Sequence, residues 1–389
     1  MAYKIRTRDE HFLSDGSPKR ILALDGGGLR GIVTLSYLAE IESLLRERHG
    51  GAGNFRLSHY FDLIAGTSTG SIIAAALARG MTVAEITKKY LDLGQKVFHK
   101  SWLREGFVRA LYDEAGLIKE LKEVYGAETM MGDASLQTGL LVITKRLDSA
   151  STWPISNNPR GKYFGVRPDG NVIANSAYPL WQIVRASTAA PRYFDPERIE
   201  ISRGKPGEKS IVGDFVDGGV SPFNNPALQA VMYATLSGYG IAWPTGADKL
   251  LVVSLGTGSR DPKVASPSLA VDNALKSLLS VMDDCAELVE LLLQWMSASA
   301  TARVIDRELG DLRDDVIAPA PLMTYLRYNV ALTKEVLAQL GMTFADEKIE
   351  TLSAMDAPDN MKTLQEIGAK AAKHQLRSEN FPSSFDLVG

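Results

Sequence analysis

A serine lies between two glycines in the segment GTSTG, residues 66–70. The mostly apolar residues 61–65 before it are typical of a short buried strand, and residues 71–79 after it predict a compact helix. A nucleophile elbow requires this strand–turn–helix context, in which small neighbours avoid collisions with the flanking elements. The expected chemistry is attack by Ser68 on a carbonyl carbon, with Gly66 and Gly70 as the elbow glycines.

Ser68 also has a simpler possible role at the start of the predicted helix. Unpaired backbone N–H groups and the helix dipole favour negative charge there, which suits the oxyanion of an acyl-transfer intermediate. Serine is also a common helix N-cap. The five residues alone do not separate a nucleophile from a capping residue.

A glycine-rich loop, DGGGLRG at residues 25–31, follows a predicted strand at 20–24 and opens a predicted helix. It satisfies G-x-G-x-x-G, so a dinucleotide-binding loop is the rival interpretation. That role needs an acidic residue at the end of the second strand, where this chain has AGTS, and no Walker motif is present. We therefore interpret the loop as an oxyanion hole built from the N–H groups of Gly26, Gly27 and Gly28, with positive charge from Arg30.

The serine needs a group that takes its proton, and none of the five histidines (His11, His49, His59, His99 and His374) has a suitable position in the sequence. Asp217 is favoured, because FVDGG at residues 215–219 places its carboxylate after an apolar segment and beside glycines that permit close approach. Asp214 is the local competitor, but no glycine pair follows it. Since Asp-Gly is also a standard turn pair, a purely structural role for Asp217 stays open.

Composition restricts the classes of protein to which the chain can belong. Hydrophobic residues make up 45% and charged residues 23%, as in ordinary globular proteins, and the net charge of -3 gives no global attraction to nucleic acid or to an anionic membrane. The single cysteine, Cys285, forms no intrachain disulfide, and the N-terminus lacks the apolar core of a signal peptide. No apolar run reaches the roughly 18 residues of a membrane span. We expect a cytoplasmic protein with at most peripheral membrane contact and no nucleic-acid polymer as partner.

Further strands are predicted at residues 140–144 and 250–255, and the alternation at 325–330 indicates an edge strand. Strands that alternate with helices predict an α/β fold with a mainly parallel sheet and helices on both faces. Residues 149–170, rich in Ser, Asn, Pro and Gly, are expected to form a surface loop. Beyond about residue 265 the pattern becomes mostly helical, over 268–309 and 345–376.

Three motifs together resemble the patatin-like phospholipases, a family that includes bacterial members and the cytosolic phospholipase A2 catalytic domain. They are DGGGLRG at 25–31, GTSTG at 66–70 and DGG at 217–219, in the order found in the family. The segments RASTAAPRYF at 185–194 and SLGTG at 254–258 extend the resemblance over roughly residues 18–260. The chain is therefore expected to have a catalytic core at 18–260 and a mostly helical region at 261–389 packed on it, in a three-layer α/β/α fold.

The resemblance implies a Ser68–Asp217 dyad without histidine, an oxyanion held by the amides of Gly26 to Gly28, and an acyl-enzyme that water resolves. It implies a phospholipid or other acyl lipid as substrate and no metal or organic cofactor. The family also includes bacterial antiviral phospholipases switched on by cyclic oligonucleotides, so a cyclic-oligonucleotide activator is an alternative form of the same activity. A nucleotide-binding module using the glycine loop is the more distant alternative. The sequence leaves the oligomeric state open.

Residues 96–112 interleave aromatic and basic side chains, with Trp102 and Phe107 among the aromatic ones. Such a segment suits a lipid interface. A cap helix with a solvated basic face is the more common role of this pattern.

Overall fold

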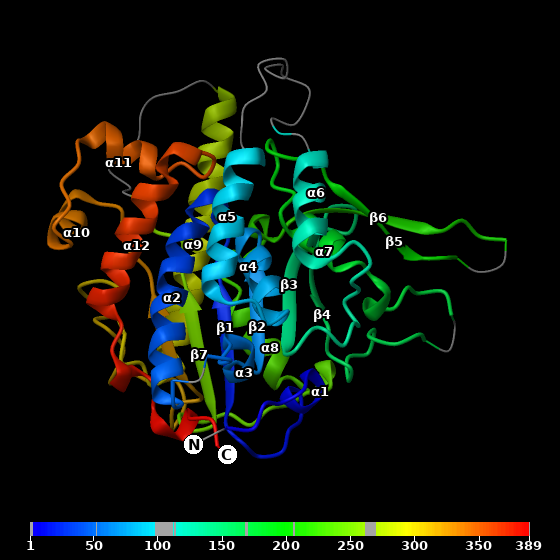
Figure 1. Cartoon of the computed structure of the whole chain (residues 1–389), viewed down its shortest axis with the longest axis horizontal. Coiled ribbons are helices and arrows are strands. Elements are labelled where there is room, and N and C mark those ends of the chain that lie inside the picture. Colours follow the sequence, from blue (N-terminus) through cyan, green and yellow to red (C-terminus); the bar gives the residue numbers. More distant parts are fainter. Residues whose placement is uncertain are drawn as a thin grey trace.

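The chain forms a central β-sheet enclosed by helices, as seen in a computed structural model (Figure 1). The structure describes residues 3–51, 53–97, 112, 114–167, 170–204, 207–260 and 270–388. Most of the aromatic and basic segment at 96–112, including Trp102 and Phe107, lies outside the described residues.

Within the described chain the sheet has eight strands, in the order β5-β6-β3-β2-β1-β7-β8, and β4 also pairs with β3. Strands β1, β2, β3, β7 and β8 are mutually parallel, whereas β4, β5 and β6 form antiparallel pairs. The strand bounds are β1 Lys19–Leu24, β2 Leu63–Thr67, β3 Gly139–Arg146, β4 Ser151–Ser156, β5 Glu197–Ser202, β6 Ile211–Asp217, β7 Leu250–Leu255 and β8 Thr324–Tyr328.

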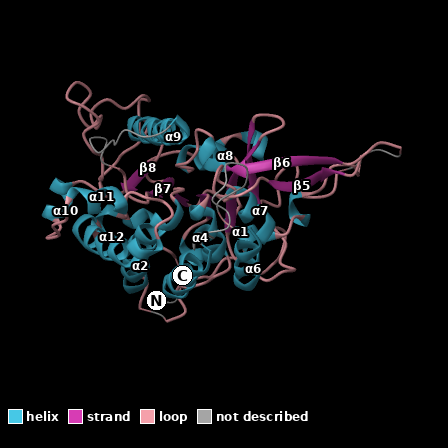
Figure 2. Ribbon diagram, turned by 90° about the horizontal axis from the view of Figure 1, so that it is seen from above, coloured by secondary structure: helices cyan, strands magenta, loops and turns pink. Residues whose placement is uncertain are grey.

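The principal helices lie on the two faces of the sheet, as the view from above shows (Figure 2). One face is covered by α8 and α9, and the other mainly by α2, α4, α5, α7 and α12, with α6 packed against α7. The helix bounds are α1 Arg8–His11, α2 Gly31–Arg48, α3 Leu57–Tyr60, α4 Thr69–Ala78, α5 Val83–Val97, α6 Glu114–Tyr125, α7 Leu180–Ser187, α8 Ala227–Thr235, α9 Ala270–Trp295, α10 Lys334–Gln339, α11 Asp346–Leu352 and α12 Met361–Gln375. The predicted three-layer α/β/α architecture is confirmed.

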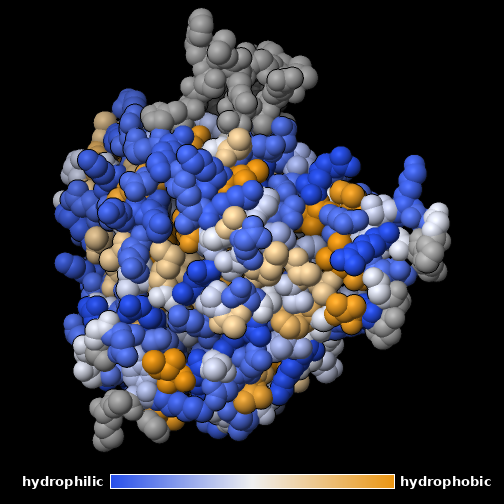
Figure 3. Space-filling model, turned by 45° about the vertical axis from the view of Figure 1, so that its right-hand side comes forward, coloured by the Kyte–Doolittle hydropathy of each residue, from blue (hydrophilic) through white to orange (hydrophobic). Residues whose placement is uncertain are grey.

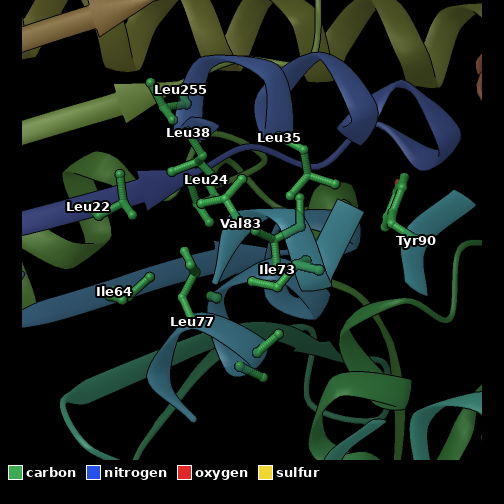
Figure 4. Close-up of a cluster of buried hydrophobic side chains, with 14 of the residues drawn as sticks. Leu22, Leu24, Leu35, Leu38, Ile64, Ile73, Leu77, Val83, Tyr90 and Leu255 are labelled. Carbon is green, nitrogen blue, oxygen red and sulfur yellow. The ribbon is translucent and has the colours of Figure 1, made fainter. Parts of the chain in front are cut away.

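Each parallel strand contributes side chains from its two faces to two separate hydrophobic cores. This explains why these strands are apolar throughout. In β1, Leu22 and Leu24 join the larger core under α2 and α4, while Ile21 and Ala23 join the core under α8 and α9. Figure 4 shows the first of these cores, with Leu22, Leu24 and Ile64 from the strands facing helix residues such as Leu35, Ile73 and Leu77.

Strands β2 and β6 meet end to end along one edge of β3, while β4 occupies the opposite edge. Thr67, the last residue of β2, pairs with Ile143, and Asp217, the last residue of β6, pairs with the next residue, Thr144. Thr144 also pairs with Trp153 of β4, which fixes β4 on the other side. Because β6 runs antiparallel to β3, its carboxyl end arrives beside the carboxyl end of β2, and two distant parts of the sequence come together.

Several local predictions differ from the structure. Part of the expected surface loop at 149–170 forms β4, which pairs with β3 along residues 151–156. The hairpin of β5 and β6 was not predicted, and it extends beyond the helical layers (Figure 1). The helix predicted over 268–309 ends at Trp295, and an irregular segment then leads to β8, the predicted edge strand. Short polar-rich strands lack the apolar runs by which the central strands were recognised.

The face that includes the β5–β6 hairpin is mainly hydrophilic, with hydrophobic side chains in several separate groups (Figure 3). Among the described residues, Val166 is 82% exposed and Ile211 is 50% exposed. Among the helices in the described parts of the chain, none combines the length and the apolar character needed to cross a bilayer.

Asp62 aligns the amino ends of β1 and β2. Its carboxylate is fully buried and accepts the Arg20 backbone N–H at 2.9 Å and the Arg20 guanidinium at 3.1 Å, while His11 Nδ1 lies at 2.8 Å. The Asp62 N–H donates in turn to the Arg20 carbonyl at 2.8 Å. Although burial alone would raise the pKa of Asp62, the charge of Arg20 and the hydrogen bond from His11 hold it well below its ordinary value.

We predict that Asp62→Asn lowers the free energy of unfolding by roughly 3–5 kcal/mol, because the buried Arg20 guanidinium loses its counter-charge. Urea denaturation at neutral pH measures the change. Asp248→Asn is the control, since the Asp248 side chain is 69% exposed and forms an ion pair with the adjacent Lys249, so a change within about 0.5 kcal/mol is expected. Equal effects of the two substitutions would contradict the structural role of Asp62.

Candidate active site

Ser68 forms the turn between β2 and α4 with an unusual backbone conformation. Its φ is 53° and its ψ is -125°, a left-handed geometry that costs a non-glycine residue about 1–3 kcal/mol. Neighbouring glycines make the turn sterically possible. A Cβ on Gly66 would lie 2.3 Å from the Gly70 carbonyl oxygen, and one on Gly70 would lie 2.1 Å from the Leu24 carbonyl oxygen. The turn therefore presses directly against the end of β1.

Ser68 occupies the N-cap position of α4, but its side chain accepts no hydrogen bond from the helix. Its backbone N–H donates to Ser187 Oγ at 2.9 Å, and its carbonyl accepts from Ser71 Oγ at 2.6 Å. The half-buried hydroxyl is thus left for another role. The helix-capping interpretation of Ser68 has no support in these contacts.

Asp217 lies beside Ser68 in a buried environment. It is 5% exposed, and its Oδ1 accepts the Gly219 N–H at 2.7 Å. Burial raises the pKa of Asp217 to about 6, against the opposing effects of the Ser68 hydroxyl and the Gly219 N–H. A carboxylate with this pKa is a stronger base near neutral pH than one with the ordinary value of 3.8.

Asp214, the alternative candidate, lies elsewhere on β6. Its side chain is 50% exposed and forms an ion pair with Arg198 at 3.4 Å. The structure therefore brings Asp217, and not Asp214, to Ser68.

The glycine loop lies against Ser68, since a Cβ on Gly26 would be 3.1 Å from Ser68 Cβ. The backbone N–H groups of the loop differ in whether they already have a hydrogen-bond acceptor. The Gly26 N–H donates to the Asn224 carbonyl at 3.1 Å, whereas within the described residues the N–H groups of Gly27 and Gly28 have no hydrogen-bond acceptor. Gly27 and Gly28 also line the cavity that contains Ser68 and Asp217. Of the three predicted amide donors, Gly27 and Gly28 therefore stay candidates for the oxyanion hole, whereas the Gly26 N–H already has an acceptor.

Arg30 does not face Ser68, contrary to the expectation that it adds charge to the oxyanion hole. Its guanidinium donates to the Gly258 carbonyl at 3.0 Å and lines a second cavity on the other side of the glycine loop. Arg30 is the last residue of the short helical turn Gly28–Arg30, and its side chain is buried.

Two polar side chains, Tyr90 and Ser187, connect the elbow with its surroundings, and the sequence predicted no role for either of them. The Tyr90 hydroxyl of α5 donates to the Gly28 carbonyl at 2.6 Å and hydrogen-bonds Thr69, so it connects the glycine loop with the residue after Ser68. Figure 4 shows Tyr90 at the margin of the hydrophobic core. Ser187 Oγ donates to the Ile143 carbonyl at 2.7 Å while it accepts the Ser68 N–H. Tyr90 follows an amphipathic pattern that gives no sign of its second role.

The cavity has a polar end and an apolar wall. Its volume is about 90 Å³, and Ser68, Asp217, Gly27 and Gly28 form the polar end. The wall is contributed mainly by large apolar side chains, namely Ile72, Leu93, Leu117, Phe194, Leu279, Met282 and Met355. The cavity thus places an apolar surface directly beside Ser68.

The four described histidines lie away from this cavity. His11 contacts Asp62, His49 bonds the Leu45 carbonyl, His59 bonds Tyr3, and His374 lines the second cavity. His99 lies outside the described residues. Within the described parts of the chain no group of three or more His, Cys, Asp or Glu side chains is arranged to hold a metal ion.

The family model of the patatin-like phospholipases matches residues 22–231, more than half of the chain. The chain belongs to this family. A cGAMP-activated phospholipase of Escherichia coli (strain TW11681) is 31% identical over 214 residues, which cover 54% of this chain and 53% of that protein. A protein of the same description from Vibrio cholerae is 29% identical over 219 residues, 54% of this chain and 56% of the relative.

Patatin-17 of Solanum cardiophyllum is 28% identical over 387 residues, covering 95% of this chain and 92% of the plant protein. The similarity to the two bacterial relatives thus spans about half of their length, whereas the similarity to the plant patatin extends over almost the whole chain.

We predict that Tyr90→Phe lowers kcat/KM about fivefold, because loss of the hydroxyl removes about 1 kcal/mol of positioning between Gly28 and Thr69. Hydrolysis of a soluble p-nitrophenyl ester measures the effect. Tyr37→Phe is the matched control, since Tyr37 is also a buried tyrosine whose hydroxyl makes a hydrogen bond, to Gln375 at 2.9 Å, away from the site. A similar loss of activity in both variants would contradict the role assigned to Tyr90.

The raised pKa of Asp217 predicts a pH-dependent gain in stability for Asp217→Asn. Burial favours the neutral carboxyl of Asp217 in the folded state. The resulting contribution to the free energy of unfolding is complete below about pH 4 and is lost as the pH rises through about 6. Asn carries no charge, so the variant should gain up to about 3 kcal/mol over the wild type between these values. Thermal unfolding from about pH 4 to pH 8 measures this, with Asp214→Asn as control. A difference independent of pH would contradict the raised pKa.

Proposed function

We propose that the protein is a lipid acyl hydrolase that cleaves fatty-acyl esters of glycerophospholipids through a Ser68–Asp217 dyad. The observation that carries the proposal is the placement of Ser68 beside the buried carboxylate of Asp217, in a cavity also lined by Gly27 and Gly28, whose N–H groups have no acceptor among the described residues. Membership of the patatin-like phospholipase family supports an acyl lipid as the substrate class.

In the first half of the reaction, Asp217 accepts the proton of the Ser68 hydroxyl as the oxygen attacks the ester carbonyl carbon. The carbonyl oxygen becomes an oxyanion, which the N–H groups of Gly27 and Gly28 stabilise. The tetrahedral intermediate collapses when the C–O bond to the alcohol breaks. Asp217 returns its proton to the departing alkoxide, and the acyl group stays on Ser68.

In the second half, water enters beside Asp217, which removes a proton as the water oxygen attacks the acyl carbon. The same amides hold the second oxyanion. Ser68 then leaves with the proton from Asp217, and the fatty acid is released. Because one carboxylate serves both halves as base and acid, a pKa of about 6 suits it better than the ordinary value of 3.8.

The apolar wall supports an acyl chain as the group that binds in the cavity. Ile72 and Leu117 come from α4 and α6, while Leu279 and Met282 come from α9 on the other face of the sheet. Burial of a hydrocarbon chain against such side chains is favourable by about 0.8 kcal/mol for each methylene removed from water.

A second candidate function is the same hydrolysis controlled by a cyclic oligonucleotide. It is favoured by the two bacterial relatives, which are both cGAMP-activated phospholipases. In that version the dyad and the amides have the same roles, and a ligand bound elsewhere raises the activity.

We predict that Ser68→Ala and Asp217→Asn each reduce hydrolysis of a phospholipid by at least about a thousandfold while the protein remains folded. A fluorophosphonate probe should label the wild type, and peptide mapping should find the label on Ser68. Asp214→Asn serves as the control and should retain activity. Labelling at another residue, or full activity in either dyad variant, would overturn the assignment.

A further inference from the structure

Asn224 brings a further polar side chain to the cavity that contains Ser68 and Asp217. The residue is 8% exposed, and its backbone carbonyl accepts the Gly26 N–H at 3.1 Å. Neither half of the proposed reaction uses its side chain. The contacts of that side chain show which of its atoms is free to act in the cavity.

The two ends of the Asn224 amide have different surroundings. Its Nδ2 donates to the Gly26 carbonyl at 3.4 Å, and this carbonyl also accepts the Thr257 hydroxyl at 3.3 Å. Its Oδ1 is buried and has no hydrogen-bond donor among the described residues. A buried acceptor without a donor destabilises a fold by roughly 1–3 kcal/mol. In the lining of a cavity, such an oxygen indicates a site for a donor that binds there.

The free oxygen lies close to both members of the dyad. A Cβ on Gly219 would lie 3.0 Å from Asn224 Oδ1 and 3.1 Å from Asp217 Oδ1. A Cβ on Gly26 would lie 2.4 Å from the same Asn224 oxygen and 3.1 Å from Ser68 Cβ. A side chain at position 219 would fill the space beside the two oxygens, and glycine leaves that space open.

Two acceptors beside one space suit a water molecule and not an oxyanion. An oxyanion is stabilised by donors, which the N–H groups of Gly27 and Gly28 can supply, and it would be repelled by the oxygens of Asn224 and Asp217. A water molecule has two O–H donors, one for each of these acceptors. With both O–H groups directed at the protein, a lone pair of the water oxygen is left for the acyl carbon on Ser68.

We propose that Asn224 is a catalytic residue of the second half of the reaction, in which its Oδ1 accepts a hydrogen bond from the attacking water while Asp217 removes the other proton. The water oxygen bonds to the acyl carbon, and the carbonyl electron pair moves to the oxyanion. The bond between this carbon and Ser68 Oγ then breaks, and Ser68 takes the proton from Asp217. The amide of Asn224 neither gains nor loses a proton. This inference rests on the proposed hydrolase function and adds a residue to it.

The two halves are separated by stopped-flow hydrolysis of a p-nitrophenyl ester, because nitrophenolate leaves in the first half and the carboxylic acid in the second. Asn224→Ala should slow deacylation roughly ten- to a hundredfold, since the water loses one of the two contacts that orient it. Acylation needs no water and should stay within about threefold of the wild type. Mass spectrometry of quenched samples should then find the acyl group accumulated on Ser68. Active sites are counted with a fluorophosphonate, so that unfolded protein does not affect the rates.

Asn158→Ala is the matched control. Asn158 is also a buried asparagine, but its Oδ1 accepts the Arg160 N–H at 2.9 Å and its Nδ2 donates to the Tyr239 carbonyl at 2.8 Å, away from the cavity. Both halves should stay within about threefold of the wild type in this variant. If Asn224→Ala does not fold, Asn224→Ser should show the same slow deacylation, because its hydroxyl is too short to replace the amide oxygen.

Unchanged deacylation in the Asn224 variant would overturn the proposal. Equal slowing of acylation and deacylation would also overturn it, because that result indicates a structural role or a contact with the oxyanion in both halves. Failure of the fluorophosphonate to label Ser68 in the wild type would instead overturn the hydrolase function, and the role of Asn224 with it.

Discussion

The meeting of β2 and β6 along one edge of β3 is the constraint on which the rest of the site depends. Two adjacent residues of β3, Ile143 and Thr144, set the positions of the strand ends that carry Ser68 and Asp217. The Ile143 carbonyl also accepts Ser187 Oγ, and a Cβ on Gly218 would lie 2.3 Å from that carbonyl oxygen. One peptide group of a central strand thus determines how closely the two candidate catalytic residues approach.

Placing a carboxylate at this junction destabilises the fold above about pH 6, because burial disfavours the charged form of Asp217. The same burial makes the carboxylate a better proton acceptor. The strained backbone of Ser68 also lowers the stability of the fold. This backbone conformation belongs to a tight turn in which Gly66 and Gly70 lie directly against backbone carbonyl groups. Stability lost at these two points is offset by the two hydrophobic cores that hold the sheet from both faces.

Much of this organisation was predictable from the sequence, because the central strands are apolar runs followed by glycine-rich turns. The pattern predicted β1, β2, β3, β7 and β8 and the elbow at Ser68. It did not predict the β5–β6 hairpin, in which exposed residues lie at several positions of each strand or at its start, nor the use of the Gly26 N–H by Asn224. Arg30 donates to the Gly258 carbonyl from a distant part of the sequence, and such hydrogen-bond partners leave no local signal.

The segment from Asp217 to Asn224 carries both the candidate base and the carbonyl that holds Gly26, so the base and the glycine loop are joined by one short stretch of chain. The apolar wall of the cavity is built separately, partly from residues of α4, α6 and α9. The apolar wall and the segment from Asp217 to Asn224 are therefore expected to differ in how well they tolerate sequence changes. In the proposed hydrolase, a library at Ile72, Leu117 and Met282 would alter the preference for acyl-chain length. Insertions between Asp217 and Asn224 would instead shift the proposed proton acceptor and oxyanion donors together.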